Sequence, residues 1–327
     1  MAHRHWLDTR EMAKPRVSRT EPTVPRRRRG RHAEYPLAPH RPVGRRHRRR
    51  LRLRWIRVSA RIEPSERSAD DRRVDHPTGA TDVVLQLEEG GGFVPIEFLA
   101  GQAPQSTLYG DGRVVFQPAA TTFPEPGPDG VIRNTSWRTA QLDTAQVEEL
   151  LTFALGQGGL GAARDRYGND MVADASTSIF KINAGGLDKT VEVYALGLED
   201  DQNATDLVPR RAFKALADRL LDFDRGGTIS TDVYLPQTFR AVLVEREGDP
   251  GAKPVPWPWP DLKMSDFQAE INGVGATQFP HRAVTAVEVV ELGLGDVPGG
   301  AQGVTLMGPD DKLYTLILRP LLPHETE

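Results

Sequence analysis

Few side chains in this sequence are of the kinds that carry out catalysis. The chain has 327 residues and no cysteine, which excludes thiol catalysis, disulfides, zinc–thiolate sites and iron–sulfur clusters. Six of its eight histidines precede Pro77, so only His281 and His324 remain beyond it. Acid–base catalysis needs titratable groups in a fixed mutual geometry, and no pattern here resembles a serine nucleophile elbow. We therefore assign no catalytic, cofactor-binding or metal-binding residue, and we interpret both histidines as solvated or capping.

The carboxylates give no clear site either. Neighbouring pairs such as Asp310 and Asp311 are typical of solvated turns, although a hydrolase site made of two carboxylates far apart in the sequence stays open as an alternative. The loop from Glu199 to Asp206 has oxygen ligands at alternate positions, as a calcium loop does, but Asp206 stands where such a loop needs glycine. We interpret the loop as acidic surface and Asp206 as the cap of the following helix.

Two stretches are candidates for binding a partner. Gly90-Gly-Gly-Phe-Val-Pro95 indicates a strand that enters a glycine hinge. Pro254–Pro260 is a polyproline-like segment with two tryptophans, which either cover a sheet edge as structural aromatics, the favoured interpretation, or form an exposed patch for a peptide, a glycan or a protein. The candidate binding surface comprises Gly91, Gly92, Phe93, Trp257 and Trp259.

The surrounding elements are mostly hairpins with glycine turns. Asp111-Gly112 supplies the positive φ angles of a tight turn between two short β-prone runs, and Gly185-Gly186 marks a second hairpin. A third, strongly apolar hairpin closes the chain, and its run Leu316-Ile-Leu318 is typical of a strand covered on both faces.

Three helices are expected among these hairpins. The first follows Asp143, with Gln146 completing a capping box and Gly156 ending the helix. The second spans about 207–223 and the third about 280–292. The sequence Gly156-Gln-Gly-Gly-Leu-Gly161 spells a dinucleotide-binding fingerprint, but it follows a helix where the fingerprint requires a preceding strand, so we interpret it as a helix stop and a loop.

This order of elements predicts an α+β fold, with antiparallel hairpins and about three helices packed on the sheet. The glycine-bearing segment 224–228 separates a first α+β domain or lobe, 78–224, from a second β-rich lobe with one helix, 225–327. No run of about 18 apolar residues suggests a membrane span, and neither a secretory leader nor a lipid-bearing cysteine is recognised.

Residues 1–77 differ sharply in charge from the rest. They hold 22 arginines, one lysine and nine acidic residues, a net charge of +14, whereas the remainder holds 19 basic and 36 acidic residues, a net charge of −17. Low hydrophobicity with high charge predicts a disordered basic extension. Two interpretations stay open: an inert or mis-assigned start, or an arm that contacts a polyanion such as nucleic acid or an anionic membrane.

Four short motifs support a resemblance over about 82–327. They are Gly91-Gly-Phe-Val94, Leu108-Tyr-Gly-Asp-Gly-Arg-Val114, Val193-Tyr-Ala-Leu-Gly197 and Arg319-Pro-Leu-Leu-Pro-His-Glu325. In order and spacing the chain resembles a family of uncharacterised bacterial proteins, many of them predicted to be exported or lipoproteins, which implies a location in the cell envelope. Over about 82–222, the Gly-Gly-Phe strand, helix and hairpin are also similar to emfourin-type inhibitors of thermolysin-like proteases.

The sequence alone leaves the function unknown. We expect a non-enzymatic binding protein with a protein or glycan partner and no cofactor, with a metalloprotease inhibitor and a carboxylate hydrolase as the alternatives.

Overall fold

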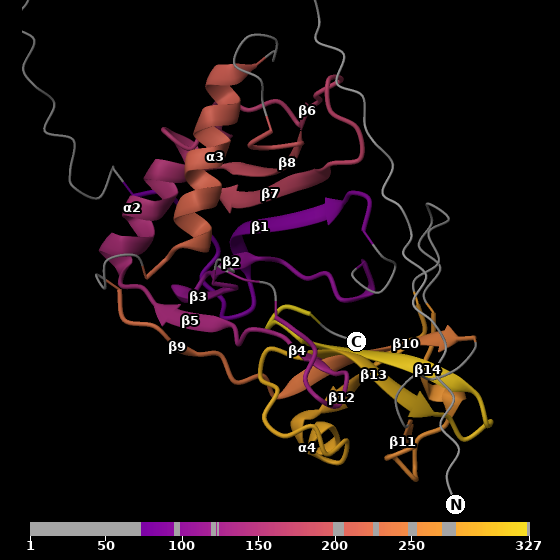
Figure 1. Cartoon of the computed structure of the whole chain (residues 1–327). Coiled ribbons are helices and arrows are strands. Elements are labelled where there is room, and N and C mark those ends of the chain that lie inside the picture. Colours follow the sequence, from indigo (N-terminus) through magenta and orange to yellow (C-terminus); the bar gives the residue numbers. More distant parts are fainter. Residues whose placement is uncertain are drawn as a thin grey trace, which may run out of the picture. The chain divides into compact units, whose positions relative to one another are not determined.

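The computed structural model describes residues 73–94, 99–118, 122, 124–198, 206–224, 229–247, 254–269 and 279–325. All of them belong to one compact unit, Ser65–Glu327. The predicted disordered extension therefore lies outside the described residues, apart from 73–77. The unit is an α+β fold, as predicted, with two sheets and with helices packed on one of them (Figure 1).

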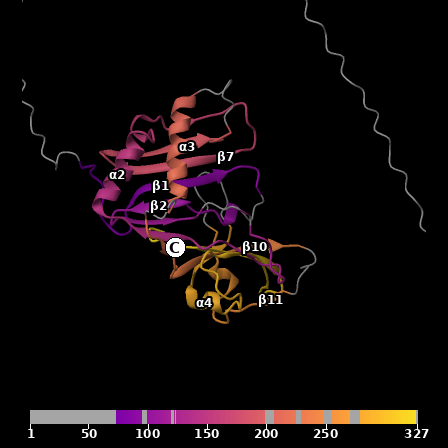
Figure 2. The ribbon, with the colours of Figure 1, turned by 60° about the vertical axis from the view of Figure 1, so that its left-hand side comes forward.

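The first sheet has eight strands in the order β6-β8-β7-β1-β2-β3-β5-β9. Its strands are β1 (Val83–Gly91), β2 (Ser106–Tyr109), β3 (Arg113–Phe116), β5 (Arg138–Gln141), β6 (Arg166–Tyr167), β7 (Ser176–Ala184), β8 (Leu187–Tyr194) and β9 (Asp232–Val233). Helices α2 (Thr144–Leu155) and α3 (Leu207–Leu221) lie on one face of this sheet (Figure 1, Figure 2). Their apolar side chains and those of β1, β7 and β8 form the larger core of the protein.

Both predicted glycine hairpins are confirmed, although in the first turn only Gly112, and not Asp111, takes a positive φ angle. In the β2–β3 hairpin Leu108 pairs with Val114, and Gly112 takes a φ of +83° in the turn. In the β7–β8 hairpin Ala184 pairs with Leu187, so that Gly185 and Gly186 alone form the loop and both have positive φ. A side chain at either loop position would strain the backbone, which explains why glycine occupies them.

Helix α2 begins and ends where the sequence predicts. The Asp143 carboxylate accepts a hydrogen bond from the Gln146 amide at 2.8 Å, and the Gln146 side chain accepts one from the Asp143 amide at 2.8 Å. Gly156 follows the last turn and donates its N–H to the Thr152 carbonyl at 3.0 Å. Residues 156–161 form a loop with the short 3-10 turn η2 (Leu160–Ala162), not a dinucleotide site at a helix start.

Substituting Asp143 tests how much the capping box contributes to the stability of the protein. Asp143→Ala should lower the free energy of unfolding by about 1 kcal/mol, because the Gln146 amide in the first turn loses its side-chain acceptor. The measurement is urea denaturation, with Thr144→Ala, an exposed first-turn position, as the control. Equal stability of the two variants would show that the capping box contributes nothing.

The predicted cap of α3 is wrong. Asp206 has a φ of +62°, and its side chain makes no capping hydrogen bond to the helix. Its carboxylate instead forms an ion pair with Arg164 at 2.5 Å. The left-handed backbone at Asp206 directs the side chain away from the first turn, toward the loop that precedes β6.

The second sheet has the strand order β11-β13-β14-β10-β12, and β4 also pairs with β13. Its strands are β4 (Ile132–Arg133), β10 (Thr238–Arg246), β11 (Val255–Pro256), β12 (His281–Thr285), β13 (Ala301–Met307) and β14 (Leu313–Pro320), accompanied by the 3-10 turn η3 (Met264–Asp266). The predicted closing hairpin is confirmed as β13–β14, and all three residues of Leu316–Leu318 are fully buried.

The third predicted helix is only partly correct. Residues 281–285 form strand β12, paired with β10, and the helix is limited to α4 (Ala286–Val290). Thr285 caps α4 through a capping box with Glu288. The run from His281 to Thr285 contains β-branched residues, which suit an edge strand. Its hydrogen bonds to β10 determine the structure here, although the apolar spacing is that of a helix.

The two sheets exchange strands across residue 224. Strand β4 precedes this residue but belongs to the second sheet, and β9 follows it but belongs to the first sheet. Strand β4 pairs with β13, while β9 pairs with β5. Residues 73–77, assigned by sequence to the extension, also contact the unit: the Val74 amide donates to both carboxylate oxygens of Glu148, at 3.1 and 2.9 Å, and Asp75 accepts from Gly185 at 2.8 Å. These residues before Thr78 therefore belong to the compact unit.

Candidate binding surface

The predicted glycine hinge lies at the end of β1. Gly91 still pairs with Ser176 of β7, and then Gly91 and Gly92 take φ values of +72° and +85°. The Phe93 amide donates a hydrogen bond to the Asp174 carbonyl at 3.2 Å. The chain thus leaves the sheet through a turn that favours glycine, and the Phe93 side chain is left 91 % exposed.

The loop that supports Phe93 is itself held in place. Asp174 has a φ of +57°, and the next amide, that of Ala175, donates to the Tyr194 hydroxyl at 3.1 Å. The same loop carries Met171, whose side chain is 73 % exposed. Two large apolar side chains are therefore displayed on neighbouring loops that are anchored by backbone hydrogen bonds.

The two tryptophans belong to a different part of the molecule. Trp259 is 1 % exposed and donates its indole N–H to the Glu288 carbonyl at 2.9 Å. Trp257 is half-buried, donates to the Leu262 carbonyl at 2.9 Å and meets Trp259 edge to face at 5.3 Å between ring centroids. Both pack in the core of the second sheet with Phe267. Their burial supports the interpretation as structural aromatics, whereas Gly91, Gly92 and Phe93 lie at an end of the first sheet.

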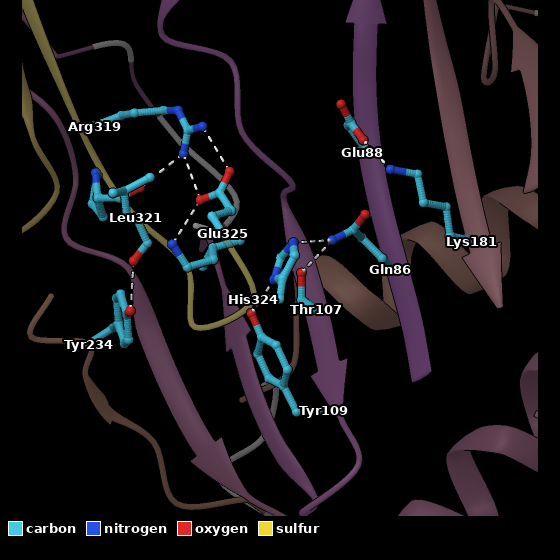
Figure 3. Close-up of polar contacts among 12 residues, drawn as sticks. Gln86, Glu88, Thr107, Tyr109, Lys181, Tyr234, Arg319, Leu321, His324 and Glu325 are labelled. Atoms are coloured by element: carbon cyan, nitrogen blue, oxygen red, sulfur yellow. Dashed lines mark hydrogen bonds and ion pairs between the residues drawn. The ribbon is translucent and has the colours of Figure 1, made fainter. Parts of the chain in front are cut away.

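The interpretation of His324 as a solvated tail residue is wrong. Its Nδ1 lies 2.8 Å from the Tyr109 hydroxyl and its Nε2 lies 3.4 Å from the Gln86 side-chain nitrogen (Figure 3). Gln86 also donates to the Thr107 hydroxyl at 3.2 Å. Because the Gln86 amide nitrogen can only donate, His324 Nε2 accepts and Nδ1 donates to Tyr109. His281, the other histidine, lies in β12 with its Nδ1 2.8 Å from the Phe279 carbonyl.

A buried ion pair holds the same C-terminal segment. Arg319 and Glu325 form two hydrogen bonds of 2.8 Å, and their side chains are 5 % and 15 % exposed. Glu325 also accepts from the Leu322 amide at 2.8 Å, and the Tyr234 hydroxyl donates to the Leu321 carbonyl at 2.9 Å (Figure 3). We call residues 319–325 the C-terminal staple, because they fasten the end of β14 to the face of the first sheet opposite the helices.

Burial and neighbouring charges together shift the pKa values of three side chains in this region. Burial lowers the pKa of His324, and the positive charges of Lys181 and Arg319 act in the same direction against the opposing effect of Glu325. Burial pushes the pKa of Glu325 upward, but hydrogen bonds and charge from Arg319 outweigh it, so that the pKa lies below its usual value. Burial raises the pKa of Tyr109. Histidine and tyrosine are thus kept neutral and glutamate ionised, in mutual contacts typical of a structural network.

The free energy of unfolding should fall at mildly acidic pH because of His324. A histidine with a lowered pKa in the folded state binds fewer protons than in the unfolded chain, so stability falls as pH drops below the unfolded value of about 6.5. Glu325 contributes separately and only at lower pH, below its unfolded value of about 4.3. We expect urea denaturation between pH 7.5 and 5 to show a decline that is smaller in His324→Gln. An identical decline in both proteins would contradict this assignment.

Among the described residues, no group of three or more histidine and acidic side chains could hold a metal ion. No helix in the described part of the chain is long and apolar enough to cross a membrane. Comparison of the sequence and the structure with protein-family models, curated proteins and solved structures gives no match. The resemblances expected from the motifs therefore remain predictions.

Sequence patterns pointed to Phe93 but not to what supports it. Asp174 and Met171 lie in a loop without regular structure some 80 residues later, and nothing local links them to the glycine hinge. Tyr109 and His324 are 215 positions apart. The only sequence signal for the staple is the motif Arg319-Pro-Leu-Leu-Pro-His-Glu325, which by itself resembles an ordinary strand end.

Proposed function

We propose that this chain is a non-enzymatic binding protein that contacts a protein partner through Phe93. The observation that carries the proposal is the combination of 91 % exposure of a large aromatic side chain with a backbone fixed by Gly91, Gly92 and the Asp174 carbonyl. A flexible loop would lose more entropy on binding, so a fixed turn favours affinity.

The neighbouring exposed groups support a protein surface as the partner. Aromatic residues are enriched among the few side chains that dominate binding energy at protein interfaces. Met171 on the adjacent loop adds a second adaptable apolar contact. Val94, which follows Phe93 and is 41 % exposed, extends the apolar area of the turn. This set is suited to a protein surface with an apolar pocket.

A non-enzymatic role is supported by how the unusual titratable groups are used. Of the two described carboxylates with a shifted pKa, Asp129 and Glu325, only Glu325 is buried, and its oxygens are engaged by Arg319 and the Leu322 amide. A carboxylate hydrolase needs two carboxyl groups facing a substrate, so Glu325 is unsuited to either role. The hydrolase alternative predicts turnover that disappears with one aspartate or glutamate substitution.

Photo-crosslinking tests the proposal directly. A benzoylphenylalanine at position 93 should label a discrete partner in extracts of the source cells, and excess wild-type protein should compete where excess Phe93→Ala should not. The control position is Val290, equally apolar and 73 % exposed on α4. Labelling that is the same from both positions, or that both competitors suppress equally, would refute the role of Phe93.

A more specific candidate is inhibition of a thermolysin-like metalloprotease. The exposed Phe93, which follows two glycines of left-handed conformation, favours this candidate. An apolar side chain on a fixed turn can occupy a protease specificity pocket with little loss of conformational entropy. The chain should then inhibit thermolysin with a nanomolar to micromolar constant. Absence of inhibition at such concentrations removes this candidate and leaves the general binding role standing.

The basic extension supports a separate proposal for a polyanion partner. Its 23 basic residues in the first 77 would release counterions on binding, so retention on DNA should fall steeply with salt and disappear when residues 1–72 are removed. Location in the cell envelope is proposed from the family resemblance alone.

A further inference from the structure

The two segments that meet at the Phe93 turn contain acidic residues and no basic ones. They are residues 82–112, which include β1 and the turn, and residues 167–180, which include the loop before β7. Neither segment contains a lysine or an arginine. Any positive charge that balances their carboxylates must therefore come from elsewhere in the chain or from a partner.

One carboxylate of β1 is balanced within the chain, whereas its neighbour is not. Glu88 forms an ion pair with Lys181 of β7 at 3.1 Å (Figure 3). Glu89 accepts hydrogen bonds from two neutral groups, the Gln105 side chain at 2.9 Å and the Ser176 hydroxyl. Among the described residues, no lysine or arginine pairs with Glu89. Its negative charge is therefore uncompensated.

The loop that supports Phe93 adds two further carboxylates. Asp170 and Asp174 are exposed, and neither forms an ion pair within the described part of the chain. Arg166, the basic residue that precedes this loop, is already paired with Glu192 at 2.6 Å. Three negative charges without a basic partner thus accompany the exposed phenylalanine.

A hollow of about 340 Å³ beside the turn makes Glu89 accessible to a partner. Its walls include Glu89 together with Gly91 and Val94, which lie on either side of Phe93, and they contain no lysine or arginine. An ionised carboxylate has about four acceptor positions, of which Glu89 uses two. The remaining positions suit the N–H donors of a lysine or an arginine, because hydrogen bonds between ionised groups are the strong ones.

We propose that the partner bound at Phe93 is a protein whose apolar pocket is bordered by lysine or arginine side chains, one of which enters the hollow and pairs with Glu89. This inference rests on the proposed function and adds the charge of the partner to it. Opposite charges across an interface accelerate association and exclude partners of the wrong sign. A partly buried pair is screened less by salt than an exposed one, so Glu89 should contribute more than Asp170 or Asp174.

A small probe tests the pairing at Glu89 without any partner. Acetyl-arginine amide should shift the side-chain amide signal of Gln105 in nitrogen-15 NMR spectra of the full-length protein, with a dissociation constant in the millimolar range. Acetyl-citrulline amide, which has the same shape and no charge, should not shift it, and Glu89→Gln should abolish the effect of the arginine probe. The signal of Gln268, exposed outside the hollow, is the control. Equal shifts with both probes would overturn the pairing.

Association kinetics test the charge of the protein partner. The protein labelled by benzoylphenylalanine at position 93 is purified, and its binding to the full-length chain is followed by biolayer interferometry. The triple variant Glu89→Gln, Asp170→Asn and Asp174→Asn should associate about tenfold more slowly at low salt and should depend less on salt. Asparagine tolerates the left-handed backbone at position 174. Glu89→Gln alone should cause most of the effect and serves if the triple variant unfolds.

A second triple variant removes the same amount of charge elsewhere. Glu247→Gln, Glu291→Gln and Asp296→Asn change exposed carboxylates in segments that accompany the second sheet. Because these residues lie outside both segments at the Phe93 turn, this variant should associate within about twofold of the wild-type rate. Equal slowing in the two triple variants would mean that only the net charge of the chain matters.

The outcomes separate this inference from the role of Phe93. A discrete labelled partner that associates equally fast with the wild type and the first triple variant overturns the basic pocket and leaves the proposed function intact. So does a partner whose labelled surface lacks lysine and arginine. Labelling from position 93 that does not differ from labelling at Val290 refutes the proposed function, and the inference about the partner's charge is refuted with it.

Discussion

Replacing Glu325 with alanine should lower the free energy of unfolding by about 3–5 kcal/mol, because Arg319 would be left as a buried charge without its partner. The two side chains are 5 % and 15 % exposed and share two hydrogen bonds, so water cannot easily take the place of the carboxylate. The Leu322 amide would also lose its acceptor. Urea denaturation of the full-length protein at pH 7 measures the effect.

A double-variant cycle shows whether the loss arises from the unpaired charge. Replacing both members, Arg319→Met with Glu325→Leu, should recover most of the stability, since apolar residues of similar volume often replace a buried pair at little cost. The surface control is Glu291→Ala, which should stay within about 0.5 kcal/mol of the wild type. A loss below about 1 kcal/mol in Glu325→Ala would mean that the staple does not hold this segment.

Local patterns with a strong steric or capping cause could be predicted from the sequence. Gly112, Gly185 and Gly186 adopt the positive φ angles that their hairpins require. Asp143 and Gln146 form the expected capping box. In each of these cases the residues that determine the conformation are within a few positions of one another, so the local sequence contains the whole cause.

Features that depend on tertiary partners could not be predicted in the same way. Helical periodicity beyond Pro280 was overridden by pairing of β12 with β10, and Asp206 formed an ion pair with Arg164 rather than a cap. The burial of His324 depends on Tyr109, far away in the chain. In each case the deciding partner comes from another element, and sequence spacing holds no information about it.

The candidate site shows the same division. The glycine hinge and the exposed position of Phe93 follow from three consecutive residues, whereas the Asp174 carbonyl that fixes the turn comes from the loop before β7. A sequence can thus indicate which side chain is displayed, while the surface around it emerges only on folding.

Phe93→Ala should weaken binding of the photo-crosslinked partner about 30-fold or more, the effect expected of a central aromatic contact. If thermolysin is inhibited, the inhibition constant should rise by the same factor. Stability should change by less than about 0.5 kcal/mol, since the side chain is 91 % exposed and leaves no cavity. Val208→Ala, 80 % exposed at the start of α3, is the matched control and should bind normally.

Gly92→Ala distinguishes the aromatic ring from its placement. The variant keeps Phe93 but puts a Cβ at a φ of +85°, where it would also lie 3.4 Å from the Ser176 backbone nitrogen. The left-handed conformation costs an alanine about 1–2 kcal/mol, so the turn should relax and present the ring differently. Binding should therefore fall although the contact residue is intact. Normal binding by Gly92→Ala together with a loss in Phe93→Ala would mean that the ring alone matters and that the fixed turn contributes nothing.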